Sequence, residues 1–196
     1  MAGKKQFDPA TALDAAMIQF WRAGYAHTSV DDLSRATGLN RSSIYSSLGD
    51  KDALFTCCLE RYATRYGAKY DAALSCAVDR PLAAARAFFD VTLERIADPG
   101  VPDGCLVAQT VMAIPVLSAS VAARAREAIG FQHTRLRTAL KAGRLPEEAA
   151  EAFATHLAAV NQSLAVMSRA GTSTEQLRAV VDVTLDALRR ALDASD

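Results

Sequence analysis

Two short amphipathic segments joined by a glycine turn constrain the fold of this chain more than any other feature. Residues 30–36 and 40–47 each place their apolar side chains on one side of a helix, and Ile44 and Leu48 lie one turn apart. Gly38, between the two segments, can adopt the positive φ that a sharp reversal between helices requires. The pattern predicts a helix-turn-helix.

The flanking segments complete a small helical unit. Upstream, residues 9–23 carry apolar side chains at the spacing of one wide helix face, and Gly24 follows them. Downstream, Asp50 suits the N-cap of a further helix, whose Leu54 and Phe55 turn inward. Three helices can therefore share one core with the start of a fourth.

The outer face of the 40–47 helix is short, polar and uncharged at its centre, which suits a DNA groove better than a protein core. Its side chains can hydrogen-bond to base edges, and nearby hydroxyl and ammonium groups can reach phosphates. The predicted base-edge contacts are Arg41, Ser42, Ser43 and Ser46, and the predicted phosphate contacts are Thr28, Tyr45 and Lys51. We also expect Thr28 and Ser29 to cap the helix that begins at Val30.

A series of residues between positions 8 and 60 carries a family resemblance. They are Ala12-Leu-Asp-Ala-Ala16, Phe20, Gly24-Tyr25, Thr28-Ser-Val30, Leu33, Ala36-Thr-Gly-Leu39, Ser43-Ile-Tyr45 and Gly49-Asp-Lys-Asp-Ala-Leu-Phe55. In this order, without a gap, they resemble the TetR family of bacterial transcriptional repressors. Where the family pattern often has a histidine and then a phenylalanine, this chain has Ser47 and Leu48. We expect Leu48 to preserve the core and Ser47 to weaken or alter a contact with the DNA backbone.

The resemblance implies an all-α fold with a three-helix helix-turn-helix head and a larger helical body. We assign residues 1–50 to the DNA-binding domain and residues 51–196 to effector binding and dimerisation. The implied function is that of a ligand-responsive transcriptional regulator without catalytic activity or a cofactor. Such a homodimeric repressor would leave a palindromic double-stranded DNA operator when a small organic effector binds.

Hydrophobic periodicity beyond residue 50 predicts a body made of helices. A loop rich in Asp, Pro and Gly, residues 98–103, divides it, and we expect Pro115 to stop the helix that follows. The predicted helices cover residues 51–76, 81–96, 104–114, 118–142, 147–169 and 174–193.

The last two helices are the predicted dimer interface. Apolar residues of the first one are spaced by 4, 3 and 4 positions, like a coiled-coil seam. The predicted interface residues are Phe153, Leu157, Val160, Leu164, Leu185 and Leu188. TetR-like proteins dimerise through a four-helix bundle of this kind; the alternative is that both helices only close the core of one chain.

A mostly apolar set of residues with a few hydrogen-bonding groups could line an effector cavity in the body. The candidates are Phe88, Phe89, Cys105, Gln109, Met112, Phe131, His133, Asn161 and Met167. Each could equally be an ordinary core or surface residue. Cys105 follows Gly104 at an expected helix start, where the positive helix end could make the thiol reactive; simple packing is the alternative.

The chain is electrically neutral, with 22 Lys and Arg against 22 Asp and Glu, whereas DNA-binding domains are typically basic. Residues 1–66 contain eight Lys or Arg and seven Asp or Glu, a net charge of plus one. Phosphate contacts would then depend on a few placed cations, backbone amides and helix N-termini. We expect modest non-specific affinity and a strong dependence on dimerisation.

Other classes of function are disfavoured. The cysteines and histidines lack the spacing of a zinc site or a disulfide framework, and no nucleophile, base or carboxylate pair is spaced for catalysis. The uncharged run at residues 104–123 is too polar for a membrane span, so we expect buried core there. With no apolar leader after Met1, we expect the protein to stay in the cytoplasm. A helical binding or adaptor protein that keeps the helix-turn-helix as a scaffold is the alternative function.

Overall fold

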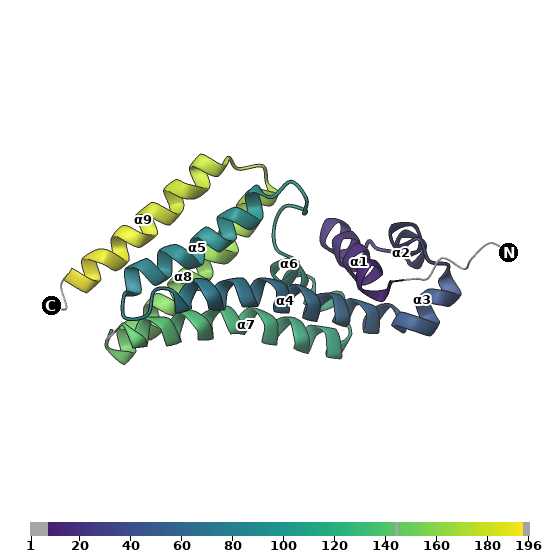
Figure 1. The fold of residues 1–196 in the computed structure, drawn as a ribbon, viewed down its shortest axis with the longest axis horizontal. Coiled ribbons are helices and arrows are strands. Elements are labelled where there is room, and N and C mark those ends of the chain that lie inside the picture. The colour runs from purple at the N-terminus through teal and green to yellow at the C-terminus, as the bar shows by residue number, and fades with distance from the viewer. Residues whose placement is uncertain (1–7, 144, 194–196) are drawn as a thin grey trace.

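The computed structural model describes residues 8–143 and 145–193, and within them the chain forms nine α-helices and one short 3-10 helix. Figure 1 shows an elongated molecule in which a small head, α1 to α3, lies at one end of α4 and a larger body extends along the rest. The helices are α1 (Pro9–Ala23), α2 (Val30–Thr37), α3 (Arg41–Leu48), α4 (Lys51–Ser75), α5 (Pro81–Ala97), α6 (Leu106–Met112), α7 (Ala119–Ala142), α8 (Glu147–Arg169) and α9 (Thr174–Asp193), with the 3-10 helix η1 (Ile114–Val116) between α6 and α7.

Side-chain caps set the helix ends in the head. Ser29 and Asp32 form a reciprocal capping box at the start of α2, in which each side chain binds the other residue's backbone amide. Asn40 caps α3 and Asp50 caps α4 in the predicted way. Gly38 ends α2 with a φ of +71°, the left-handed conformation expected of it. The helix-turn-helix is therefore fixed by local residues, each cap contributing about 1 kcal/mol.

An aromatic core joins the head to α4. Phe20 and Trp21 of α1 are completely buried, and so is Phe55 of α4. The ring centroids of Phe20 and Phe55 are 4.7 Å apart, and those of Trp21 and Tyr62 are 5.0 Å apart, both in edge-to-face arrangements. Truncation of such a buried ring to alanine costs about 3–5 kcal/mol, so these contacts hold α1 firmly on α4.

The body is a helical bundle built along α4. This 25-residue helix continues from the head into the body and lies beside α7 (Figure 1). Helix α5 packs against α4 and α9, and α8 packs against α7 and α9. Any movement of α4 relative to the bundle would therefore carry the head with it.

The structure confirms the all-α fold, and the predicted helix bounds were wrong mainly around α6. The α-helix begins at Leu106 because Gly104, with a φ of +85°, and the extended Cys105 cannot join it. It ends at Met112, before Pro115. Pro115, which we expected to stop this helix, lies instead in the first turn of η1. Proline is tolerated there because a backbone N–H in the first turn has no acceptor within the helix.

The expectation that residues 104–123 form buried core was only partly correct. Cys105, Leu106 and Val107 are buried, whereas Met112 and Val116 are 66% and 67% exposed because α6 ends there and the chain turns across the surface toward α7. Within the described ranges, we find no helix with the length and apolar character needed to cross a bilayer.

An ion-pair triad adds to the contact between α1 and α4. Asp14 of α1 accepts two hydrogen bonds from Arg61, at 2.6 and 2.7 Å, and one from Arg65, at 2.6 Å. The hydrogen bond from Arg61 is the main reason that the pKa of Asp14 lies below its ordinary value of 3.8. The pKa of Asp14 is lower in the folded chain than in the unfolded chain, so ionised Asp14 stabilises the fold fully above pH 3.8. This stabilisation is lost as the pH falls through the pKa of the folded chain.

We predict that Asp14→Asn lowers the free energy of unfolding by about 0.5–1 kcal/mol at pH 7, since the three side chains are partly exposed. Urea unfolding measured at a series of pH values should show the loss shrink as wild-type Asp14 becomes protonated. Asp186→Asn, which removes an exposed partner of Arg189 on α9, is the matched control and should cost less. A loss for Asp14→Asn that stays constant from neutral to strongly acidic pH would contradict the prediction.

Candidate nucleic-acid interface

The outer surface of α3 is polar and accessible, as the periodicity predicts. Ile44 is 2% exposed and faces the core. On the opposite side Arg41, Ser42 and Ser46 are exposed, and Ser43 is half-buried. The Asn40 side chain accepts hydrogen bonds from the Ser42 hydroxyl and the Ser43 amide, both at 2.8 Å, so the first turn is well ordered.

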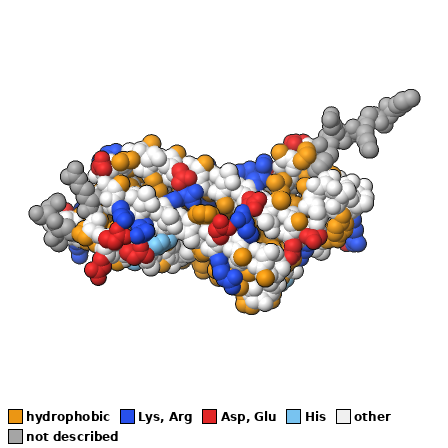
Figure 2. All heavy atoms as spheres, turned by 90° about the horizontal axis from the view of Figure 1, so that it is seen from below, with side chains coloured by type: hydrophobic (Ala, Val, Ile, Leu, Met, Phe, Trp, Pro, Cys, Tyr) orange, Lys and Arg blue, Asp and Glu red, His pale blue; other side chains and the backbone are white. Residues whose placement is uncertain are grey.

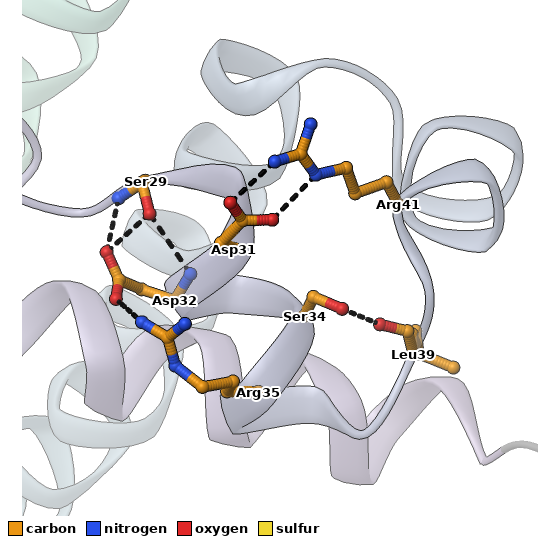
Figure 3. Close-up of polar contacts among 7 residues, drawn as sticks. All are labelled: Ser29, Asp31, Asp32, Ser34, Arg35, Leu39 and Arg41. Atoms are coloured by element: carbon orange, nitrogen blue, oxygen red, sulfur yellow. Dashed lines mark hydrogen bonds and ion pairs between the residues drawn. The ribbon is translucent and has the colours of Figure 1, made fainter.

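The one charged side chain of α3 is held by a carboxylate of α2. Figure 3 shows the Arg41 guanidinium facing Asp31, with two parallel hydrogen bonds of 2.6 Å from Nε and 2.5 Å from Nη2. Both side chains are more than half exposed, at 64% and 51%. The hydrogen bonds from Arg41 lower the pKa of Asp31, so the pair is ionised at neutral pH. In this state the cation nearest the recognition surface is neutralised.

Sequence reasoning missed this pair, although Asp31 was visible in the first turn of its helix. The helix-turn-helix motif could have indicated the pair, because the turn at Gly38 brings Arg41 at the start of α3 beside Asp31 at the start of α2. The other contacts in Figure 3 stabilise the motif: Ser34 donates a hydrogen bond to the Leu39 carbonyl across the turn, and Arg35 pairs with Asp32.

Tyr45 and Ser47 extend the polar surface toward the end of α3. Tyr45 is 52% exposed, and within the part of the chain that the structure describes its hydroxyl makes no hydrogen bond. Ser47, which replaces the family's usual histidine, is also exposed. A phenol and a hydroxyl at this edge can both donate to phosphate oxygens.

The two other predicted phosphate contacts differ in accessibility. Lys51, in the first turn of α4, is half-buried, with its ammonium 4.2 Å from the centroid of the Tyr25 ring; burial lowers its pKa. Thr28 is 1% exposed, and its hydroxyl donates to the Gly24 carbonyl at 2.7 Å. The expectation that Thr28 caps α2 was wrong, because Ser29 is the N-cap and Thr28 faces inward. Its buried hydroxyl is not presented to a duplex.

Charged side chains of both signs are interspersed on the described part of the chain. On the face of the molecule in Figure 2, Lys and Arg side chains lie next to Asp and Glu. Thirteen ion pairs of Arg or Lys with Asp or Glu join described residues, among them Arg61 with Asp14 and Arg124 with Glu60. The mixed charge agrees with the neutral composition.

The residues predicted to line an effector cavity lie in several different places. Cys105, Gln109 and Met112 share a cavity of about 280 Å³ between α6 and α8. Phe131, which is 47% exposed, borders another, of about 270 Å³, between α4 and α7. Since these cavities have separate walls, the nine candidates do not line one common space.

The remaining candidates are core or surface residues in this structure. Phe88 and Phe89 are completely buried in α5, and Met167 packs partly buried against the core. His133 lies at the surface, with Nε2 3.1 Å from Glu151 Oε1. Asn161 is buried and accepts a hydrogen bond from the Thr92 hydroxyl at 2.5 Å.

Cys105 is packed inside the body. The side chain is 7% exposed, and the Tyr62 hydroxyl donates to its Sγ at 3.3 Å. These contacts agree with the packing alternative for this cysteine.

Four of the six residues predicted at the dimer interface are buried within a single chain. Leu157, Leu164 and Leu188 are 0% exposed and Leu185 is 2% exposed, because the seam faces the body's own core. Only the half-buried Phe153 and Val160 keep accessible surface. The predicted seam therefore closes the core of a single chain, which was the alternative for these two helices, and offers little surface to a second chain.

Comparison with known proteins agrees with this architecture. Residues 12–57 match the family model described as bacterial regulatory proteins, tetR family. The chain is 30% identical to the HTH-type transcriptional repressor ComR of Escherichia coli K12 over 189 residues, which cover 92% of this chain and 89% of ComR.

Two solved structures give the same result for the fold. The TetR family transcriptional regulator CifR, as a cysteine mutant complexed with 26-bp double-strand operator DNA, is 28% identical, with a TM-score of 0.80 over 93% of this chain and 97% of that one. A TetR regulator from Legionella pneumophila is 16% identical, with a TM-score of 0.81 over 93% and 98% of the two chains, and shows the shared fold. The chain belongs to the TetR family of bacterial regulatory proteins.

Proposed function

We propose that this protein is a homodimeric transcriptional repressor that binds a palindromic operator through α3 and releases it when a small organic effector binds. The observation that carries the proposal is the exposed polar face of α3, presented by a capped helix-turn-helix whose opposite side is anchored in the core. The similar proteins support it, since ComR is named a repressor and CifR was solved with its operator.

The α3 surface suits the major groove in size and chemistry. In a helix-turn-helix the second helix enters the groove and its N-terminal residues approach the base edges. Here those residues are Arg41 and Ser42, followed by Ser46 one turn later. Tyr45 and Lys51 flank them at positions suited to phosphate contacts. Two such helices in one dimer would contact half-sites about 34–36 Å apart.

The Arg41–Asp31 pair balances the one positive charge of α3. A duplex that binds α3 would contact the Arg41 guanidinium, whose charge Asp31 already balances, and would bring its phosphates close to the Asp31 carboxylate. For Arg41 to donate to guanine, it must exchange one ionic partner for another, and Asp31 must face the phosphates. Asp31 would thus reduce affinity for every sequence while keeping Arg41 oriented.

We predict that Asp31→Asn increases affinity for double-stranded DNA and steepens its salt dependence, because Arg41 becomes free to neutralise a phosphate or bind a base. The slope of log K against log salt should grow by about 0.9 for one additional phosphate contact. Arg41→Ala should weaken binding and change sequence preference if the guanidinium reads bases. Fluorescence anisotropy at several salt concentrations measures both effects.

A double variant separates release of Arg41 from simple loss of negative charge. In the Arg41→Ala background, Asp31→Asn should give a smaller gain in affinity, because only the repulsion between the carboxylate and the phosphates is removed and no guanidinium is freed. Asp71→Asn, which removes the same charge from an exposed ion pair with Arg135, is a second control and should leave DNA affinity unchanged. An undiminished gain in the double variant would contradict a specific role for the pair. No affinity of the unmodified protein for any duplex at low salt would contradict the proposed function and favour the adaptor alternative.

The proposed dimer would use the outer faces of α8 and α9. On α8 the exposed residues Ala152, His156, Ala159 and Ser163 follow the 4, 3, 4 spacing of one helix face. On α9 Val180, Val183 and Ala187 have similar spacing, and Val183 is 72% exposed. Neither set contains Asp, Glu, Lys or Arg, and small side chains allow two helices to approach closely. Such a surface suits a four-helix contact between two copies.

We predict that Val183→Glu shifts the protein to a monomer, because pairing would bury an uncompensated carboxylate. Sedimentation velocity should detect the change, and affinity for a palindromic duplex should fall with it. Val78→Glu is the matched control and should stay dimeric, since Val78 is 58% exposed and lies beside Thr138 and Ala142 of α7 rather than on the proposed face. A Val183→Glu protein that remains dimeric would remove this face from the interface.

A further inference from the structure

Arg169, at the end of α8, connects the body directly to the head. Its Nη2 donates to the Arg22 carbonyl at 2.8 Å, and its Nη1 donates to the Trp21 carbonyl at 3.2 Å. Both carbonyls belong to the last turn of α1, where the oxygens have no partner within the helix and carry partial negative charge. Arg169 therefore caps α1 from the body, independently of the contacts between α1 and α4.

The same arginine lines the cavity of about 280 Å³ between α6 and α8. Most of the wall is apolar or small, and the exposed Met112 and Val166 border it, as do Cys105, Ala108, Ala165 and Ala170. Gly104 lies against α8, where an added Cβ would come within 3.4 Å of the Ala165 carbonyl oxygen.

The polar groups of this cavity are Gln109 and Arg169. Gln109 Oε1 accepts a hydrogen bond from Arg169 Nη1 at 2.6 Å, and its Nε2 occupies the space that a Cβ on Gly24 would fill. The amide thus lies between the cavity and the end of α1. The cavity thus combines an apolar wall with one cationic side chain, that of Arg169, which already donates hydrogen bonds to the end of α1.

Arg169 is charged, yet all its partners among the described residues are neutral. It donates to two backbone carbonyls and one amide oxygen, and no carboxylate of residues 8–143 or 145–193 pairs with it. A carboxylate is a stronger partner for a guanidinium than a carbonyl, because it can accept two charge-assisted hydrogen bonds. At about 280 Å³ the cavity lies just below the usual range of ligand sites, about 300–1,000 Å³, so it suits a small ligand with a short apolar chain.

We propose that the cavity between α6 and α8 binds a small aliphatic monocarboxylate, whose carboxylate takes Arg169 away from the end of α1. The chain of the acid would lie against Met112, Val166 and the alanines. Loss of the two hydrogen bonds to Trp21 and Arg22 would uncap α1 and loosen the head from the body. This inference rests on the proposed function, because it names the chemical class of the effector and its route to the DNA-binding head.

Trp21 provides a direct readout of binding that does not involve DNA. It is the single tryptophan of the chain and is fully buried; its backbone carbonyl contacts Arg169, and its Nε1 donates to the Asp103 carbonyl at 3.1 Å. Titration of the full-length protein with octanoate should give a saturable change in tryptophan fluorescence. Octan-1-ol, which has the same chain length without the charge, should bind at least about tenfold more weakly.

Variants of Arg169 test the site further. Arg169→Leu should weaken octanoate binding about tenfold or more, and Arg169→Lys, which keeps the charge but not the paired donors, should lie between it and wild type. Arg80→Leu is the matched control, since Arg80 also donates to a backbone carbonyl, that of Cys76 beyond the end of α4, at 3.0 Å. It should bind octanoate like wild type.

The DNA-binding readout separates this inference from the proposed function. Octanoate should lower operator affinity of the wild-type protein, and octan-1-ol at the same concentration should not. Equal fluorescence titrations by the acid and the alcohol, or octanoate binding that is unchanged in both Arg169 variants, would overturn the inference while leaving DNA binding intact. Absence of DNA binding before any octanoate is added would contradict the proposed function instead.

Discussion

The packing of α1 against the first half of α4 is the contact on which the rest of the structure depends. Phe20 and Trp21 lie against Phe55 and Tyr62, and these side chains are almost completely buried. Helices α2 and α3 complete this core through Leu33 and Ile44, so the recognition surface has no independent support. Since α4 also lies along α7 in the body, the direction in which α3 points is set by helices far from it in sequence.

Two of the connections between the head and the body differ in kind. One is the aromatic contact with α4, which is apolar and strong; the other is the polar cap that Arg169 places on α1. The aromatic contact should persist in every state of the folded chain, because separating the rings would expose a large buried apolar surface. The hydrogen bonds from Arg169 can break reversibly, because they can be exchanged for other hydrogen bonds at small net cost. A ligand could thus change the head's freedom without unfolding its core.

The head was predictable because its turns are determined by local chemistry. Gly38, Asn40 and Asp50 have the conformations and caps that their residue types require, and the family resemblance is confirmed. The interface seam was less predictable, since α8 has an apolar face and an alanine-rich face at the same spacing. Leu157 turned inward because larger side chains gain more from burial. The cap that Arg169 places on α1 joins residues over 140 positions apart, which periodicity cannot reveal.

Selection of bound duplexes from a random DNA pool tests the account most directly. If α3 reads the major groove in a dimer, the selected sequences should contain an inverted repeat with half-site centres about 34–36 Å apart, one helical turn of DNA. Arg41 at the start of α3 should favour a guanine at a fixed place in each half-site. Selected pools without any shared motif, or with a single motif that is never repeated, would contradict a paired reader built on α3.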